Sequence, residues 1–205
     1  MTWTLRRGDS GAQVRRLQRR LKDLHYWVGP VDGVYGQLTE QAVFAFQGVE
    51  GLSIDGVTGP NTRAALAEAS PPTARSDSGN LIEVDEQARV VLDVRGGEVR
   101  WAWHTSTGTN QRYQHPAGHT ALAETPDGRH TIDWQVDGWR ENELGRLWRP
   151  KYFHPDGIAL HGFSSVPASP SSHGCVRLTL PAMDFIWAND IAPEGSTVWV
   201  YGRAP

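Results

Sequence analysis

The 205-residue sequence has a single cysteine, no long apolar run and only a small net charge. One cysteine, Cys175, excludes an internal disulfide and any zinc cluster built on several cysteines. No stretch approaches the roughly 20 apolar residues that span a bilayer, so no transmembrane segment is expected. The formal charge of -3 gives no general electrostatic reason to bind nucleic acid, and no such partner is expected.

The first residues do not read as a secretory signal peptide. Met1 to Thr4 lead directly into Leu5-Arg6-Arg7-Gly8, without a basic segment followed by an apolar one. Either the protein works inside the cell, or its leader has been trimmed or is not included in this sequence. The substrate inferred below favours the second explanation.

Residues 70–79 are rich in proline and serine and lack apolar periodicity, which is typical of an interdomain linker. Helical spacing of apolar residues precedes this segment, and strand-like alternation follows it. We therefore predict two domains, residues 1–69 and residues 80–205, joined by a linker at 70–79. Such a linker suggests some freedom of orientation between the domains.

The first domain is predicted to be a bundle of three helices. Apolar residues recur at helical spacing between residues 14 and 24. Two Asp-Gly-x-x-Gly segments, 32–36 and 55–59, then each precede a further apolar run, so the sequence repeats a turn followed by a short helix. Three polar residues are the predicted N-caps: Ser10, Thr39 and Asn61.

This first domain resembles the peptidoglycan-binding-domain-1 family, a three-helix wall-binding module. The resemblance rests on the helix sequence Val14-Arg15-Arg16-Leu17-Gln18, the repeated Asp-Gly-x-x-Gly and Ala45-Phe46-Gln47. It covers roughly residues 5–68, and it implies binding to the glycan strands or stem peptides of peptidoglycan. The alternative is a helical bundle without a ligand.

The second domain is predicted to be mainly β. Runs rich in β-branched residues at 81–85 and 89–94, a Gly-Gly turn at 96–97 and alternation at 99–104 indicate a β-meander. Further strands are expected at 130–136, 157–161 and 197–201, and a short helix is expected at 181–187 with proline in its first turn.

Residues 158–178 contain a candidate nucleophile. A thiol reacts as its thiolate, and a nearby imidazole promotes this by taking the proton. Two histidines are available to Cys175: His161 at the end of an apolar strand, and His173 two residues before the cysteine. Gly174 permits a tight turn that aims backbone N–H groups at a developing oxyanion. The alternative is a buried structural thiol.

Arg177 is a candidate substrate contact. If the chain is extended here, His173, Cys175 and Arg177 share one face. The guanidinium would then lower the pKa of the thiol and offer a fork to a substrate carboxylate. The alternative is an ion pair between Arg177 and an acid such as Asp184.

These residues resemble the signature of the L,D-transpeptidase catalytic domain (the YkuD family). His161 is followed by a ten-residue loop at 162–171 and by Ser172-His173-Gly174-Cys175-Val176-Arg177. The loop is short for the family, and Glu124 stands where a proline is frequent. Supporting matches occur at Ser106-Thr107-Gly108, Thr125-Pro126-Asp127-Gly128 and Gly195-Ser196-Thr197-Val198.

The resemblance implies Cys175 as nucleophile and His161 as base and acid. Residues implied in the turn, the oxyanion hole and substrate contacts are Ser172, His173, Gly174, Gly162 and Arg177. In the implied cycle, Cys175 attacks the third residue of a stem tetrapeptide and expels D-Ala. An amine from another stem then resolves the thioester into a 3→3 cross-link. No cofactor is expected, and carbapenems are expected to acylate Cys175.

The sequence thus predicts an α+β multidomain protein, a three-helix bundle plus a mainly-β L,D-transpeptidase catalytic domain. The expected location is extracytoplasmic, in the bacterial cell wall or periplasm. Two alternatives stay open: an L,D-carboxypeptidase, in which water resolves the acyl-enzyme, and a catalytically silent wall-binding protein. Cysteine peptidases of the papain-like type place the cysteine before the histidine, the reverse of the order found here.

Residues 138–150 lack periodicity and are predicted to form a lid or wall of the substrate groove. Trp139, Trp148, Tyr152 or Phe153 is expected to line that groove, so Trp148→Ala should weaken turnover while folding stays intact. A zinc site on His154, His161, His173 and Cys175 is not expected. His154 and His161 are seven positions apart, which on one strand places them on opposite faces.

Overall fold

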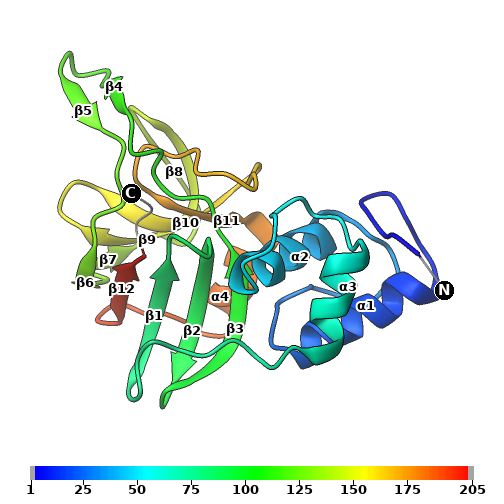
Figure 1. Cartoon of the computed structure of the whole chain (residues 1–205). Helices are drawn as coiled ribbons and strands as arrows, with labels where there is room; N and C mark the ends of the chain where they lie inside the picture. Colours follow the sequence, from blue (N-terminus) through cyan, green and yellow to red (C-terminus); the bar gives the residue numbers. More distant parts are fainter. Residues whose placement is uncertain (1–2, 203–205) are drawn as a thin grey trace.

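The computed structural model describes residues 3–202, so the outermost residues of both predicted domains lie outside it. Three helices form the N-terminal bundle, as predicted: α1 (Ala12–Asp23), α2 (Gln37–Val49) and α3 (Pro60–Glu68) (Figure 1). Their apolar side chains, including Leu21 and Phe46, are fully buried between the helices. Within the described residues, no helix has the length and apolar character needed to cross a membrane.

A buried glutamine explains each copy of the Asp-Gly repeat. Gln18 on α1 donates from Nε2 to Asp32 Oδ1 at 2.8 Å and accepts from the Gly33 N–H at 2.8 Å. Gln47 on α2 does the same one repeat later, with Asp55 Oδ1 at 2.7 Å and the backbone N–H groups of the second turn. The preceding helix therefore holds each turn, which satisfies polar groups that burial would otherwise leave unpaired.

The predicted N-caps are wrong by one to three residues. The helices begin after glycines, so that Gly11, Gly36 and Gly59 replace Ser10, Thr39 and Asn61 as N-caps. None of these glycines offers a side-chain cap, and at α2 and α3 the Asp-Gly-x-x-Gly turns supply the entry geometry instead. Thr39 lies inside the first turn of α2, where its hydroxyl donates to the Val34 carbonyl at 3.2 Å.

The C-terminal region contains two main sheets. The first has the order β3-β2-β1-β12-β6, in which β1 runs parallel to β12 and the other neighbours are antiparallel. Its strands are β1 (Asn80–Asp85), β2 (Val90–Arg95), β3 (Glu98–His104), β6 (Gly128–Thr131) and β12 (Thr197–Tyr201). The predicted meander is thus confirmed.

The second sheet has the order β11-β10-β9-β7, with β8 paired to β9. Its strands are β7 (Trp134–Gln135), β8 (Trp139–Asn142), β9 (Gly145–His154), β10 (Ile158–Phe163) and β11 (Val176–Thr179). Helix α4 (Leu180–Ala188) contacts β9, β10 and β11, and the Thr179 side chain caps it by accepting from the Ala182 N–H. The predicted fold class, α+β with a mainly-β second domain, is therefore confirmed.

Two hairpins extend from these sheets. Strands β4 (Arg112–Gln114) and β5 (Thr120–Leu122) form an arm that projects at the upper left of Figure 1, away from the helical bundle. Strands β8 and β9 form the other hairpin, which accounts for the segment 138–150 that showed no periodicity. Every residue of β8 is exposed, so the strand has no buried face and its sequence shows no apolar alternation.

The helical bundle and the first sheet share one hydrophobic core. Tyr26 and Phe46 belong to the same buried cluster as Val90 and Ala102, and the Trp27 N–H donates to the Ala102 carbonyl at 3.0 Å. The intervening segment is also fixed, since Ser76 N–H donates to the buried Glu83 at 2.7 Å. These contacts contradict the expected freedom of orientation between the domains. The prediction failed because the proline and serine content of a segment does not reveal the contacts that it makes.

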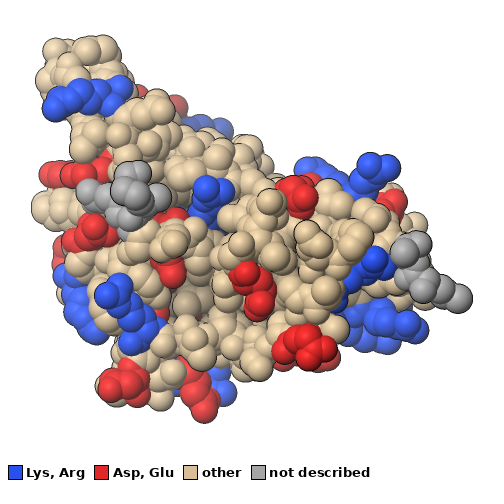
Figure 2. All heavy atoms as spheres, in the orientation of Figure 1, with Lys and Arg blue, Asp and Glu red and all other residues tan. Residues whose placement is uncertain are grey.

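Surface charge is mixed over most of the molecule. On the face drawn in Figure 2, Lys and Arg gather beside α1, while both signs occur elsewhere. Arg16 and Arg19 are exposed on that helix. Arg20 instead donates to the carbonyls of Leu66 and Ala69 at the end of α3, both at 2.8 Å.

Candidate active site

A cavity of about 690 Å³ opens between the two hairpins, above β10 and the turn that precedes β11. The β4–β5 hairpin forms one wall and the β8–β9 hairpin forms the other. Six sequence-predicted site residues line it: Tyr152, His161, Ser172, His173, Cys175 and Arg177. Gly162, Gly174 and Trp148 do not line it.

Cys175 is partly buried at the base of this cavity. Its side chain packs against the buried residues Leu147, Tyr152 and Ala159. This burial raises the pKa of the Cys175 thiol, although the Ala159 N–H and the charge of Arg177 oppose the shift. At neutral pH the resting group is therefore a thiol.

His161 lies on β10, the strand that pairs with β11 directly after Cys175. β10 and β11 are parallel, with Leu160 opposite Val176, so Cys175 adjoins Ala159 and His161 follows on the same face. His161 Nδ1 is 2.9 Å from the Gly162 carbonyl, which only accepts. Nδ1 therefore carries the hydrogen, and Nε2 is the basic nitrogen. Burial lowers the pKa of His161 to about 4.

Hydrogen bonds within the 172–175 turn fix the cysteine backbone. The buried Ser172 hydroxyl accepts from the Gly174 N–H at 3.0 Å and donates to the Cys175 carbonyl at 2.6 Å. Gly174 has φ +139°, and a Cβ there would lie 2.6 Å from the Glu124 carbonyl oxygen. Ser172 and Gly174 thus build this turn.

Thr125 holds the same turn from outside. Its buried hydroxyl donates to the Gly174 carbonyl at 2.7 Å and accepts from the Gly108 N–H at 3.0 Å. Thr107 supports the neighbouring residue, because its carbonyl accepts from the Ser172 N–H at 3.0 Å. Thr107 and Thr125 lie in two segments that match the family, and the only sign of this role in the sequence is that both segments lie between predicted strands.

His173 and Arg177 face the cavity in different ways. The exposed His173 ring packs on Tyr113 with centroids 4.4 Å apart, and partial burial lowers its pKa, aided by Arg177 and His115. Arg177 lies over the Phe163 ring at 4.2 Å and donates to the Ser171 carbonyl at 3.1 Å. The alternative pairing with Asp184 is not formed.

Trp148 and Gly162 lie on the other face of the sheet, which corrects their expected place in the groove. They are paired across β9 and β10, and a Cβ on Gly162 would lie 2.8 Å from the Trp148 ring. Trp148 Nε1 donates to Asp184 on α4 at 2.7 Å. The pairing of β9 with β10 shifts register between Leu160 and Gly162, so residues on the two sides of the shift face opposite sides of the sheet. Tyr152 remains in the cavity, where its ring stacks on Trp134 at 4.0 Å.

Several cavity residues were not anticipated from the sequence. His115 and His119 stack at 4.7 Å on the β4–β5 arm, and His115 Nδ1 is 3.8 Å from Glu143 Oε2 on the opposite hairpin. No motif marks these residues, since two hairpins distant in sequence bring them together. Among residues 3–202, no group of three His, Cys, Asp or Glu side chains is arranged to hold a metal ion.

Comparison with known proteins yields two family matches. A family model of a peptidoglycan binding domain matches residues 10–66, and one of the L,D-transpeptidase catalytic domain matches residues 79–200. Among solved structures, an L,D-transpeptidase (residues 123–326) from Xylanimonas cellulosilytica is 42% identical, with 98% of both chains covered and a TM-score of 0.93. An L,D-transpeptidase from Stackebrandtia nassauensis, 21% identical with 98% and 96% covered and a TM-score of 0.55, shares the fold.

Similarity to curated proteins is confined to shorter segments. A spore cortex-lytic enzyme of Bacillus cereus is 42% identical over 66 residues, 32% of this chain and 26% of that protein. The amidase CwlM of Mycobacterium tuberculosis is 43% identical over 56 residues, 27% of this chain and 14% of that protein. The chain thus spans about a quarter or less of the length of these relatives.

Proposed function

The chain belongs to the L,D-transpeptidase catalytic domain family, and from that premise we propose that Cys175 and His161 perform peptide exchange on peptidoglycan. One observation carries the proposal: the sole thiol, in the turn directly before β11, and a buried imidazole on the adjoining strand β10 open into one cavity. Both groups are uncharged at neutral pH, because burial raises the pKa of the thiol and lowers that of the imidazole. Such a pair suits general-base catalysis.

The first half-reaction forms a thioester. Sγ attacks the carbonyl carbon of the third residue of a stem tetrapeptide as its proton passes to His161 Nε2. The oxyanion is stabilised by N–H groups of the 172–175 turn. Because the Gly174 N–H already donates to Ser172, this task falls to the N–H groups of His173 and Cys175. The protonated imidazole then gives its proton to the departing amine of D-Ala.

The second half-reaction releases the enzyme. The amine of another stem attacks the thioester carbon and loses a proton to His161. The thiolate of Cys175 leaves and regains that proton, so the product is a 3→3 cross-link and the starting state is restored. No nucleotide or other cofactor is required, because the thioester conserves the energy of the broken peptide bond.

The helical domain is proposed to bind peptidoglycan glycan strands or stem peptides, which places the protein at the bacterial cell wall or periplasm. This rests on the peptidoglycan binding domain matched at residues 10–66. Carbapenems are proposed to acylate Cys175 by the same first step, since their strained carbonyl presents an acyl group to the thiol. Arg177 and Tyr152, which line the cavity, are proposed substrate contacts.

Two other functions give different outcomes. In an L,D-carboxypeptidase, water resolves the thioester and tripeptides are the only product. In a silent wall-binding protein, no acyl-enzyme forms. The curated relatives do not favour the second, because the spore cortex-lytic enzyme and the amidase that share 66 and 56 residues with this chain are themselves named as enzymes.

Incubation with tetrapeptide muropeptides, followed by mass spectrometry, tests the proposal. The wild type should give 3→3 dimers, and Cys175→Ala and His161→Ala should lose at least about 10³-fold in rate. His154→Gln is the matched control, because His154 does not line the cavity. Tripeptides alone would indicate hydrolysis. If neither product appears and a carbapenem adds no mass, the chain is not an acyltransferase.

A further inference from the structure

The loop at residues 164–171, which joins β10 to the 172–175 turn, is held by side chains from outside it. Three of its carbonyls accept from the catalytic domain: Pro167 from His104 at 2.9 Å, Ala168 from Arg89 at 2.6 Å, and Ser169 from Ser106 at 2.8 Å. The loop has no helix or strand of its own. These side chains therefore satisfy its backbone and set its path.

Two further bonds to this loop come from the peptidoglycan binding domain. Gln41 on α2 donates from Nε2 to the Val166 carbonyl at 2.7 Å, and both residues are buried. Gln37, one turn earlier, lies 3.4 Å from the Ser164 carbonyl at the surface. The Gln41 bond spans 125 positions of sequence and crosses from one domain to the other.

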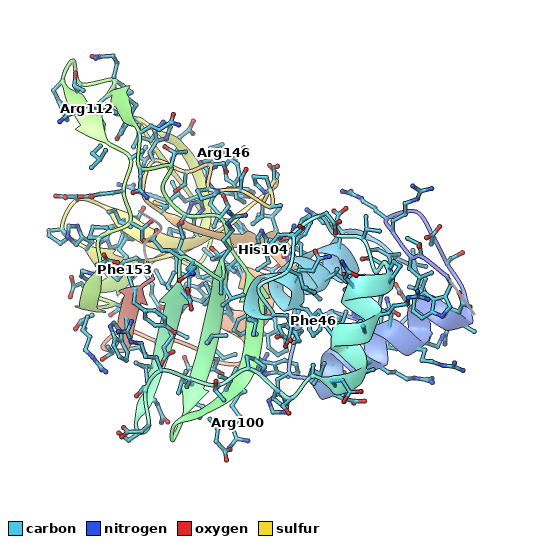
Figure 3. All side chains as sticks on the ribbon, viewed as in Figure 1. Phe46, Arg100, His104, Arg112, Arg146 and Phe153 are labelled. Atoms are coloured by element: carbon cyan, nitrogen blue, oxygen red, sulfur yellow. The ribbon has the colours of Figure 1, made fainter. Side chains whose placement is uncertain are left out.

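One face of α2 makes this contact. Gln37, Gln41, Phe44 and Gly48 recur at helical spacing and so form a single stripe. Phe44 packs on His104 with ring centroids 5.0 Å apart, and Figure 3 shows His104 at the junction of α2 and the sheet. A Cβ on Gly48 would overlap the carbonyl of Ala88 on the catalytic domain. The stripe is thus fitted closely to its neighbour.

We propose that Gln41 is a positioning residue for the active site, so that the peptidoglycan binding domain is part of the catalytic scaffold as well as an anchor. The inference rests on the proposed function of Cys175. The 164–171 loop ends at the turn that presents this thiol, and Gln41 fixes the buried middle of the loop. Loss of its donor leaves a buried carbonyl unpaired, and small displacements of a catalytic group are costly in rate.

Gln41→Met tests this, because methionine keeps the length and removes the donor. We expect kcat for muropeptide dimer formation to fall about tenfold while KM stays within about twofold. Iodoacetamide should alkylate Cys175 about threefold faster or more, since a loosened turn exposes the thiol. If Gln41 contributed only to stability, its substitution would lower the fraction of folded protein. It would not lower kcat per folded molecule while raising the alkylation rate of the thiol. Gln13→Met, on the exposed surface of α1, should match the wild type.

Gly48→Ala provides a second test that removes no hydrogen bond. Alanine favours the helix, so α2 should persist while the new methyl group pushes it away from Ala88. The same fall in kcat and rise in alkylation are expected. Faster amide hydrogen exchange at residues 164–174 should accompany both.

Wild-type kcat and alkylation rates in folded Gln41→Met and Gly48→Ala proteins would overturn the inference. Failure of both variants to fold, while Gln13→Met folds, would also overturn it, because Gln41 would then act on stability alone. If the wild type forms no muropeptide product, the proposed function fails separately. Alkylation and hydrogen exchange would still decide whether Gln41 positions the loop.

Discussion

At the scale of single residues, the reactivity of Cys175 is set by what surrounds its sulfur. Leu147, Tyr152 and Ala159 remove water from the thiol, and Gly174 allows the turn to lie directly against Glu124. A side chain at residue 174 would require a strained φ and would push the turn away. The site thus keeps an uncharged thiol and an uncharged imidazole on the lining of one cavity.

Thiol alkylation should report this environment. Because burial raises the pKa of Cys175, the iodoacetamide rate should climb about tenfold per pH unit from pH 6 to 9 without levelling off near neutrality. The chain has one cysteine, so the whole signal comes from this site, and Cys175→Ser is the blank. A plateau reached by pH 7 would instead reveal a preformed thiolate and imidazolium pair.

At the scale of elements, a register shift in the β9–β10 pair decides which side chains reach the cavity. Trp148 and Tyr152 are four apart on β9, so regular alternation would place them on one face. Arg149 between them has φ +50°, and the pairing shifts by one residue there. Tyr152 therefore faces the cavity, and Trp148 fastens β9 to α4.

The expected effect of Trp148→Ala changes accordingly. The substitution should lower the free energy of unfolding by about 2 to 3 kcal/mol, because it removes the packing on Gly162 and the bond to Asp184. Trp139→Ala is the matched control, since Trp139 is 46% exposed and its loss should cost less than about 1 kcal/mol. Urea titration measures both. If Trp148→Ala leaves the free energy of unfolding unchanged and lowers turnover, Trp148 contacts substrate in the groove and this account is wrong.

At the scale of the whole molecule, two buried histidines link the fold to pH. His104 lies at the contact between α2 and the 164–171 loop, and His161 lies in the site. Burial lowers the pKa of each to about 4. The unfolded chain takes up these protons near pH 6.5, well before the folded protein does.

Acid should therefore destabilise the protein within a defined window. Stability should be full above pH 6.5, fall as pH drops from 6.5 to 4, and level off for these groups below 4. Each histidine contributes up to about 3 kcal/mol of this loss. Denaturation midpoints at pH 7.5, 6 and 4.5 measure it. His104→Gln, which keeps a donor but does not titrate, should show a shallower slope; an equal slope would contradict this account.

The sequence by itself determined the elements and the chemical groups of this protein. Spacing of apolar residues located the three helices of the bundle, the strands of the meander and α4, because these patterns are local. Ser172 to Arg177 with His161 upstream also identified the candidate site, because this run of residues resembles the signature of the L,D-transpeptidase catalytic domain. The predicted N-caps failed because each helix begins after a glycine, and for α2 and α3 that glycine ends a turn held by a buried glutamine.

Only the tertiary structure decided which groups meet. Thr125 reaches Gly174 across 49 positions, and Gln41 reaches Val166 across 125. No local pattern encodes such pairs, because they depend on how separate elements dock. The face of Trp148 was likewise decided by a shift in strand pairing. The cavity walls arise from two hairpins whose own sequences carry no motif, so their joint position was set by packing alone.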